Sequence, residues 1–252
     1  MTINPANGAV LTSLPLHDSN PANLYGLTGL AYQASTDTLF GSTSKQSPNG
    51  VSSLVSVNRT TGVVTVIGSF NAGGNTMADI TFQPGTGTLF GWSSGSTPAL
   101  FTINTTTGAA TMVGSPLPTS NTYGGGGLAF NSTGTLYSAP DGGGATDLRT
   151  VDPTTGVHTS IGPITGGITT YVNAMKFDGS NTLYGSFSPG GGPSGLGSIN
   201  TMTGAVTPLG ASADWLDAIE FVPVPEPASL LLSSAAVVGL VGYWRRRRTA
   251  VQ

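Results

Sequence analysis

The sequence predicts an all-β domain of repeated four-stranded units over residues 1–223, followed by a C-terminal segment, residues 224–252, with one transmembrane helix. Three observations lead to this prediction. A short turn motif recurs at nearly constant spacing, strand-like runs flank each copy, and an uncharged apolar run lies near the C-terminus. Before that run, no stretch has the periodicity of an amphipathic helix, so we expect strands throughout the body.

The turn motif consists of Asn or Asp, three further residues and Gly. Its five copies are NPANG at 4–8, NRTTG at 58–62, NTTTG at 104–108, DPTTG at 152–156 and NTMTG at 200–204. Asn and Asp side chains bond to the backbone of a turn, and Gly allows the positive φ that closes it. Because alternating apolar residues lie on both sides of the later copies, each of these copies predicts a β-hairpin.

A second hairpin is predicted upstream of each later motif, at residues 29–42, 79–92, 127–139 and 174–186. Its first strand ends in Tyr or Phe, and its second strand begins with Thr-Leu-Phe or Thr-Leu-Tyr. Each unit therefore contains four strands. Four-stranded units with a period of about 40–50 residues are typical of the blades of a β-propeller. The alternative is a β-sandwich or a solenoid of stacked hairpins.

The two ends of the body each hold part of a unit. Residues 2–16 hold only a second hairpin, and residues 215–223 hold only a first strand, in which Phe221 aligns with Phe177. If the two parts join in one blade, the propeller has about five blades. Alternatively, the N-terminal part is the remainder of a longer chain that begins upstream of Met1.

The C-terminal segment contains 17 uncharged residues from Ala228 to Trp244. As a helix they would span roughly 25 Å, which is close to the lower limit for crossing a membrane. We predict a transmembrane helix at about 227–244, with the body outside the cytoplasm because arginine clusters stay on the cytoplasmic side. The alternative is a buried helix with a solvated basic end. The predicted membrane flank consists of Tyr243, Trp244, Arg245, Arg246, Arg247 and Arg248.

The same segment resembles the PEP-CTERM sorting signal of Gram-negative bacteria. The triplet Pro225, Glu226 and Pro227, the hydrophobic helix and the basic tail at 245–248 occur in the order of that signal. The resemblance implies export, transient anchoring in the inner membrane and processing near the triplet by an exosortase-type enzyme. It further implies a final location at the cell surface or outside the cell, often together with exopolysaccharide. It implies nothing about the fold of the body.

A protein sorted in this way is expected to begin with a signal peptide. The first residues, MTINPANGAV, show neither a basic n-region nor an apolar core. We therefore expect either a true start upstream of Met1 or a sequence that is a fragment.

Composition excludes several functions. Residues 1–223 carry ten acidic and four basic side chains, so we expect no face that binds nucleic acid. The chain has no cysteine, which excludes disulfides, thiolate metal sites and cysteine nucleophiles. His17 is expected in a polar loop and His158 at a solvent-facing strand position, and neither lies in a metal-binding motif. We predict no catalytic residues, no metal site and no cofactor, with calcium near Asp141, Asp147 or Asp178 as the alternative.

One set of residues could form a ligand site. The first strands carry a small or acidic residue three positions before their aromatic residue: Gly29, Asp79, Gly127, Ala174 and Ala218. First strands line the central channel of a propeller, so small side chains there would let the blades converge. Asp79, Asn173 and Asp217 could then meet at the channel mouth and bind a cation or a polar ligand. The alternative is that they are ordinary polar residues at strand edges.

These observations favour a non-enzymatic binding or structural module, exported and associated with exopolysaccharide or the cell envelope. Aromatic side chains at Trp92, Tyr171 and Trp215 could bind sugars, unless they lie in the core. The alternative function is that of a propeller-type lactonase or hydrolase with a metal in its channel. That alternative would require several convergent carboxylates or histidines.

Overall fold

The structure, a computed structural model, describes residues 1–23, 25–94, 98–117, 126–140, 146–166, 171–188, 194–213 and 216–223. The chain divides into two compact units, Met1–Phe221 and Val222–Gln252. The predicted triplet Pro225–Pro227, the helix at 227–244 and the flank Tyr243–Arg248 lie outside the described residues. Every regular element in the described ranges is a β-strand, and these ranges contain no helix long and apolar enough to cross a bilayer.

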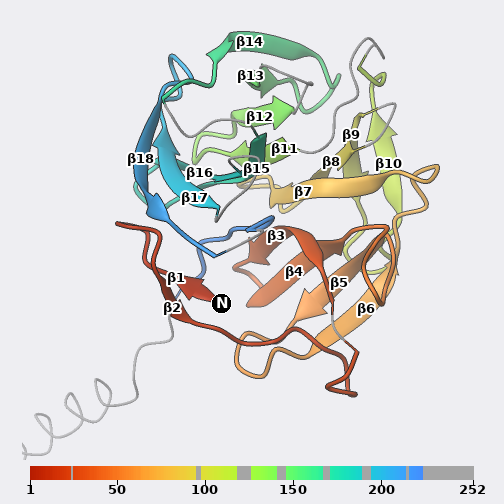
Figure 1. Cartoon of the computed structure of the whole chain (residues 1–252). Helices are drawn as coiled ribbons and strands as arrows, with labels where there is room; N and C mark the ends of the chain where they lie inside the picture. The colour runs from red at the N-terminus through yellow and green to blue at the C-terminus, as the bar shows by residue number, and fades with distance from the viewer. Residues whose placement is uncertain are drawn as a thin grey trace, which may run out of the picture. The chain divides into compact units, whose positions relative to one another are not determined.

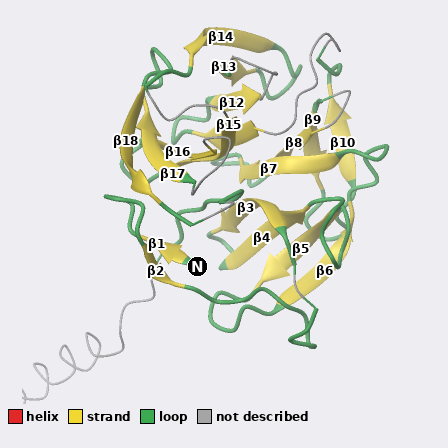
Figure 2. Ribbon diagram, in the orientation of Figure 1, coloured by secondary structure: helices red, strands yellow, loops and turns green. Residues whose placement is uncertain are grey.

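Four antiparallel sheets of four strands each form the body of the first unit (Figures 1 and 2). Blade 1 contains β3 (Leu27–Gln33), β4 (Thr38–Thr43), β5 (Ser53–Val57) and β6 (Val64–Ser69). Blade 2 contains β7 (Thr76–Phe82), β8 (Leu89–Ser94), β9 (Leu100–Ile103) and β10 (Ala110–Val113). Blade 3 contains β11 (Gly126–Phe130), β12 (Leu136–Pro140), β13 (Asp147–Val151) and β14 (His158–Pro163). Blade 4 contains β15 (Tyr171–Phe177), β16 (Leu183–Ser188), β17 (Gly195–Ile199) and β18 (Val206–Ala211).

The four sheets have a propeller-like arrangement, which confirms the predicted four-stranded repeats. In each blade the strands pair in sequence order, so every neighbour is connected by a hairpin. The first strands β3, β7, β11 and β15 contact one another in turn, and β15 also contacts β7 and β3. These first strands therefore surround a common axis, and the fourth strands lie at the rim (Figure 1).

The recurring motif forms the outer turn of each blade as predicted. In blade 1, Asn58 Oδ1 accepts hydrogen bonds from the N–H groups of Thr60 (2.9 Å) and Thr61 (3.0 Å). Gly62 closes the turn with a φ of +76°. The same side-chain bonds recur at Asn104 and Asp152. The turn therefore fixes the register of the outer hairpin in each copy.

The hydrophobic core lies mainly between adjacent blades. One cluster joins Leu54 of blade 1 to Met77 of blade 2, and another joins Trp92 of blade 2 to Leu128 of blade 3. A third cluster, which includes Met175, joins blades 3 and 4. Each blade is thus stabilised chiefly by its neighbours, as expected when a repeat cannot bury its apolar face alone.

Aromatic side chains repeat at the seams between successive blades and where blade 4 meets residues 216–221. The second strand of one blade contributes a ring that packs on the ring at the end of the next first strand. The pairs and the distances between their ring centroids are Phe40–Phe82 (5.7 Å), Phe90–Phe130 (5.4 Å), Tyr137–Phe177 (5.4 Å) and Tyr184–Phe221 (5.2 Å). The last pair places residues 216–221 at a first-strand position beside blade 4, which confirms the alignment of Phe221 with Phe177.

The two ends of the unit lie together beyond blade 4. Ile3 packs against a cluster that contains Leu216 and Ile219, and a Cβ on Gly210 of blade 4 would collide with Asn7. On the other side, Glu220 accepts a hydrogen bond from Tyr32 N of blade 1 at 3.1 Å. The ends therefore close the ring.

The predicted count of about five blades is corrected to four. The N-terminal hairpin contains only β1 (Thr2–Ile3) and β2 (Val10–Thr12), which form a separate two-stranded sheet. Residues 216–221 pair with no strand in the described ranges. The described residues therefore form no four-stranded sheet at the fifth position, because they contain no equivalent of a second strand there.

Candidate functional site

The first strands approach one another closely around the axis because small residues face their neighbours. A Cβ atom on Gly127 would lie 2.6 Å from the backbone nitrogen of Met175, and one on Gly29 would lie 2.7 Å from Asp79 Cα. Real Cβ atoms do not tolerate such contacts, so these positions require Gly. This agrees with the prediction that small first-strand residues let the blades converge.

Asp79 lies on the axis side of β7 and is fully buried. Its Oδ2 atom accepts hydrogen bonds from the backbone N–H groups of Leu128 (2.9 Å) and Met175 (3.2 Å). Its Oδ1 atom accepts from Ile80 N at 2.8 Å and from the Lys176 ammonium at 3.3 Å. One carboxylate thus ties the first strands of blades 2, 3 and 4 together.

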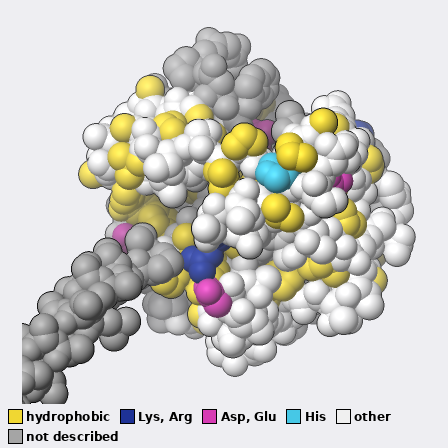
Figure 3. All heavy atoms as spheres, turned by 90° about the horizontal axis from the view of Figure 1, so that it is seen from below, with side chains coloured by type: hydrophobic (Ala, Val, Ile, Leu, Met, Phe, Trp, Pro, Cys, Tyr) yellow, Lys and Arg dark blue, Asp and Glu magenta, His cyan; other side chains and the backbone are white. Residues whose placement is uncertain are grey.

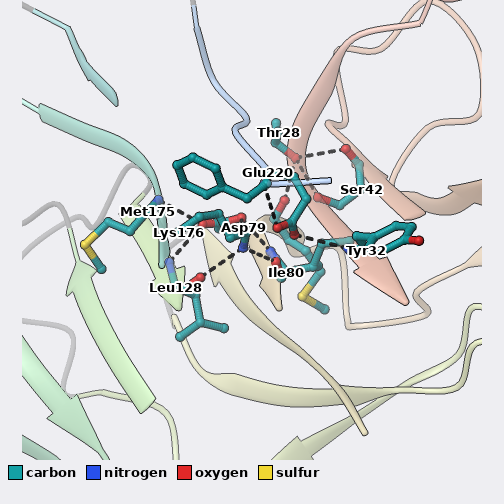
Figure 4. A network of polar contacts seen from close by, with 11 residues as sticks. Thr28, Tyr32, Ser42, Asp79, Ile80, Leu128, Met175, Lys176 and Glu220 are labelled. Atoms are coloured by element: carbon teal, nitrogen blue, oxygen red, sulfur yellow. Dashed lines mark hydrogen bonds and ion pairs between the residues drawn. The ribbon is translucent and has the colours of Figure 1, made fainter. Parts of the chain in front are cut away.

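Lys176 is the cation of this cluster and is only 3% exposed. Besides Asp79, its Nζ atom donates to the carbonyl oxygens of Ile80 (2.5 Å) and Leu128 (3.2 Å). Its three ammonium hydrogens therefore have three acceptors, which is what a buried charge requires. Figure 4 shows these contacts crossing the axis from blade 4 to blades 2 and 3.

Glu220 adds a second carboxyl group to the network (Figure 4). Its two oxygens accept from Tyr32 N at 3.1 Å and from Phe221 N at 2.9 Å. The prediction from sequence missed both Lys176 and Glu220. They occupy one repeat position, at which the first three copies have Ala31, Thr81 and Ala129, so a charge at this otherwise uncharged position was the available signal.

Burial dominates the protonation of both carboxyl groups. It raises the pKa of Asp79 to about 6, against the attraction of Lys176 and three backbone N–H groups. It raises the pKa of Glu220 to about 7, again against the attraction of Lys176. The folded state therefore holds protons on these two carboxyl groups more tightly than the unfolded chain does. As a result, these groups lower the free energy of unfolding as the pH rises.

This shift gives a testable pH dependence. Relative to the variant Glu220→Gln, the wild type should lose unfolding free energy as the pH rises from about 4.5 to about 7.5, because only the wild type must ionise the buried carboxyl group of Glu220, whereas Asp79 is common to both proteins. Urea unfolding at several pH values measures the difference. The variant is needed as a reference because burial also lowers the pKa of His158 to about 4. This lowered pKa makes the free energy of unfolding rise with pH, which is opposite to the effect of Glu220. If the difference in unfolding free energy between the wild type and Glu220→Gln stays constant over this pH range, the raised pKa of Glu220 is contradicted.

A pocket of about 410 Å³ lies at one end of the axis. Thr28, Thr76, Gly126 and Tyr171, which line it, come from the starts of β3, β7, β11 and β15, so every blade contributes. Ser94, Ser188 and Gln46 add further hydroxyl and amide groups. Apart from the charged side chains of Lys45 and Asp217, the lining is therefore rich in neutral groups that both donate and accept hydrogen bonds.

Two of the three predicted ligand residues line this pocket. Asn173 donates to Ser188 Oγ at 2.6 Å and to Leu216 O at 3.4 Å, which fixes its amide beside residues 216–221. Asp217 lies in the same lining, and burial raises its pKa. Asp79 is not in the lining. The structure thus brings Asn173 and Asp217 together and leaves Asp79 in the buried network.

The other candidate residues have mixed outcomes. Tyr171 is 40% exposed and lines the pocket, whereas Trp92 is only 1% exposed, so its role as a surface platform is excluded. The prediction that His158 faces solvent is wrong, since its ring packs on Trp92 with 5.0 Å between centroids and its Nδ1 lies 3.2 Å from Ser138 Oγ. Trp215 and Asp141 lie outside the described residues.

The described residues contain few side chains that could bind a metal ion together. None of these ranges brings three or more His, Asp or Glu side chains together in a group that could hold a metal ion. Asp178 instead accepts bonds from Ser180 N (3.0 Å) and Thr182 N (2.8 Å), which is the pattern of a turn.

Comparison with known proteins assigns the C-terminal segment and the fold. Residues 223–248 match the family described as the PEP-CTERM protein-sorting motif, so the chain carries this sorting motif. No curated protein matches the chain. The body is a propeller-like domain similar to several solved structures.

Three of these structures have TM-scores above 0.5. A β-1,3-galactosidase of glycoside hydrolase family 43 has a TM-score of 0.57 at 13% identity, over 84% of this chain and 50% of that protein. An exo-β-1,3-galactanase from Clostridium thermocellum has 0.55 at 12%, over 81% and 53%. A putative exo-β-1,3-galactanase from Bifidobacterium bifidum has 0.54 at 10%, over 74% and 70%. The chain therefore spans about half the length of the first two, and the likeness shows the fold alone.

Proposed function

We propose that this protein is an exported carbohydrate-binding protein of the cell surface or extracellular matrix, and that its ligand occupies the axial pocket. The observation that carries the proposal is the pocket lining. Hydroxyl and amide side chains from blades 1, 2 and 4 converge there beside the exposed ring of Tyr171, and blade 3 adds the backbone of Gly126. Sugars present hydroxyl groups that both donate and accept, and their apolar faces pack on aromatic rings, so such a lining suits a neutral glycan.

The scarcity of charge supports the same ligand class. Only 8% of all residues are charged, and the face drawn in Figure 3 shows few charged side chains among neutral and apolar ones. A polyanionic ligand would require a basic surface. Two structural relatives are named as exo-β-1,3-galactanases, which makes a β-1,3-linked galactan the first glycan to test.

Variants in the pocket test the binding site. Replacing Asn173 by Ala or Asp217 by Asn should weaken glycan binding about five- to thirteenfold, because each change removes a hydrogen bond worth about 1–1.5 kcal/mol. Affinity electrophoresis in gels that contain the glycan, followed by calorimetry with oligosaccharides, measures the loss. Thr106→Ala, in an exposed turn at the rim, is the matched control and should bind like the wild type. If all three variants bind the glycan equally well, the pocket is not the binding site.

We propose binding without hydrolysis. Glycoside hydrolysis uses two carboxyl groups, and metal-assisted hydrolysis uses several ligands around the ion. The described lining of the pocket contains one carboxyl group, Asp217, and no histidine. Reducing-end and lactonase assays on the purified protein test this part, and turnover abolished by Asp217→Asn would favour the hydrolase instead.

The sorting motif supports export and processing by an exosortase-type enzyme, with transient anchoring in the inner membrane. Replacing Pro225, Glu226 and Pro227 together by Ala should leave the protein unprocessed and associated with the inner membrane. Fractionation and immunoblotting in a host that contains an exosortase measure this. Lys45→Ala is the control in the body and should be processed normally. A triple variant that reaches the surface at its processed size would contradict the proposal.

A further inference from the structure

The pair formed by Lys176 and Asp79 has a geometry that a simple ion pair does not require. The two residues are 97 positions apart in sequence, and the pair links blade 4 to blade 2 across the axis. Their side chains are 4% and 0% exposed, and Nζ lies 3.3 Å from Oδ1. The proposed binding pocket does not use either residue. An amine and a carboxyl group are thus held together in a site shielded from water.

The surrounding carbonyl groups orient the amine toward the carboxyl group. Ile80 O and Leu128 O hold two of the three hydrogens on Lys176 Nζ, and the third faces Asp79. When this third proton moves to Asp79, the lone pair on Nζ is left directed at the carboxyl group. A neutral amine facing a neutral acid is the reactive form for amide formation.

The backbone polarises the carboxyl group in the sense that such an attack requires. Leu128 N and Met175 N both donate to Oδ2, at 2.9 Å and 3.2 Å. Two fixed N–H donors on one oxygen stabilise the negative charge that develops there when a nucleophile adds to the carbon. The other oxygen, Oδ1, faces Lys176 and becomes the leaving group.

We propose that Lys176 and Asp79 condense after folding to form an intramolecular isopeptide bond. Nζ bonds to Cγ of Asp79, the bond from Cγ to Oδ1 breaks, and Oδ1 leaves as water. Both hydrogens of this water come from the Lys176 ammonium group, and its third hydrogen stays on the amide nitrogen. An ammonium ion and a carboxylate thus become one amide and one water, so no oxidant, reductant or further reactant is required.

Glu220 is the proton carrier in this scheme. Its carboxyl group interacts electrostatically with both Lys176 and Asp79, and Figure 4 shows it beside this pair. Because its pKa is raised to about 7, both of its protonation states are populated at neutral pH. It can therefore take up a proton from the amine side and return it to the departing oxygen.

The bond would serve the role that disulfides serve in other exported proteins. The chain has no cysteine, and a cross-link between distant positions restricts the unfolded chain more than a local one does. The amide would also replace a buried ion pair by a neutral group, while Oδ2 keeps its two N–H donors.

Intact-mass measurement of the folded full-length chain tests the proposal directly. The wild type is expected to be lighter than its sequence by one water molecule, and fragmentation should show a branched peptide that joins Lys176 to Asp79. Asp79→Ala and Lys176→Met should keep the full mass. Asp79→Asn should form the same bond with loss of ammonia instead of water. Folded wild type that keeps its full mass after prolonged incubation at neutral pH overturns the proposal, and this outcome requires no variant to fold.

Glu220→Gln separates the role of the acid from the bond itself. The variant should keep the full mass over times at which the wild type loses water completely. If Glu220→Gln loses water at the wild-type rate, the role of Glu220 as proton carrier is overturned.

Discussion

Relative to wild-type protein in which Lys176 and Asp79 have not condensed, replacing Lys176 by Met is expected to lower the free energy of unfolding by about 3–5 kcal/mol at neutral pH. The substitution removes the cation that contacts Asp79 Oδ1, and it leaves the carbonyl oxygens of Ile80 and Leu128 without their buried donor. Asp79 must then either remain charged in an apolar site or take up a proton, and both cost stability. Chemical unfolding followed by tryptophan fluorescence measures the change.

Two further variants serve as references for Lys176→Met. Lys45→Met changes the same residue type at an exposed position and should alter stability by no more than about 0.5 kcal/mol. The double variant Asp79→Leu with Lys176→Met removes both charges and should recover much of the loss. If Lys176→Met is no less stable than Lys45→Met, the network does not hold the first strands together.

Gly127→Ala should destabilise the domain by about 3 kcal/mol, a large value for the addition of one methyl group. The new Cβ atom would lie 2.6 Å from the backbone nitrogen of Met175, which cannot move like the end of a flexible side chain. Blades 3 and 4 would have to separate at the axis. Since Met175 N also donates to Asp79, the change would weaken the buried network as well. Thermal unfolding measures the effect.

Gly179→Ala is the matched control for this prediction. A Cβ atom at Gly179 would have no neighbour within 4 Å, and its backbone does not have a positive φ. Its stability should change by less than about 1 kcal/mol. Equal losses in the two variants would show that the effect comes from backbone flexibility rather than from the close approach of the first strands.

The sequence was sufficient to predict the strands and their grouping, because those features depend on local chemistry. The Asn or Asp and Gly of each turn fix the outer hairpin through bonds within five residues, as at Asn58. The recurring aromatic residue allowed the alignment of Phe221 with Phe177, and the ring contacts confirm it. The blade count failed because sequence does not show whether two half-units pair into one sheet.

The site was only partly predictable, because the contacts that decide it join distant blades. Asp79 was expected at the channel mouth, but its partners are in β11 and β15, and a repeat pattern contains no information on which blades touch across the axis. His158 was expected to face solvent, but a ring from blade 2 covers it. Asn173 and Asp217 both line the pocket because they occupy equivalent places, each four positions before the aromatic residue of its repeat.

The position of residues 216–221 has a mechanical consequence. The stretch leads directly into the sorting motif, and it is held by Tyr184 on one flank and by Tyr32 on the other. Tension applied to the chain beyond Phe221 would therefore reach residues 216–221, at the first-strand position, before it reached any fourth strand. The resistance of the domain to mechanical unfolding from this end would depend on the contacts that residues 216–221 make with Tyr184 and Tyr32.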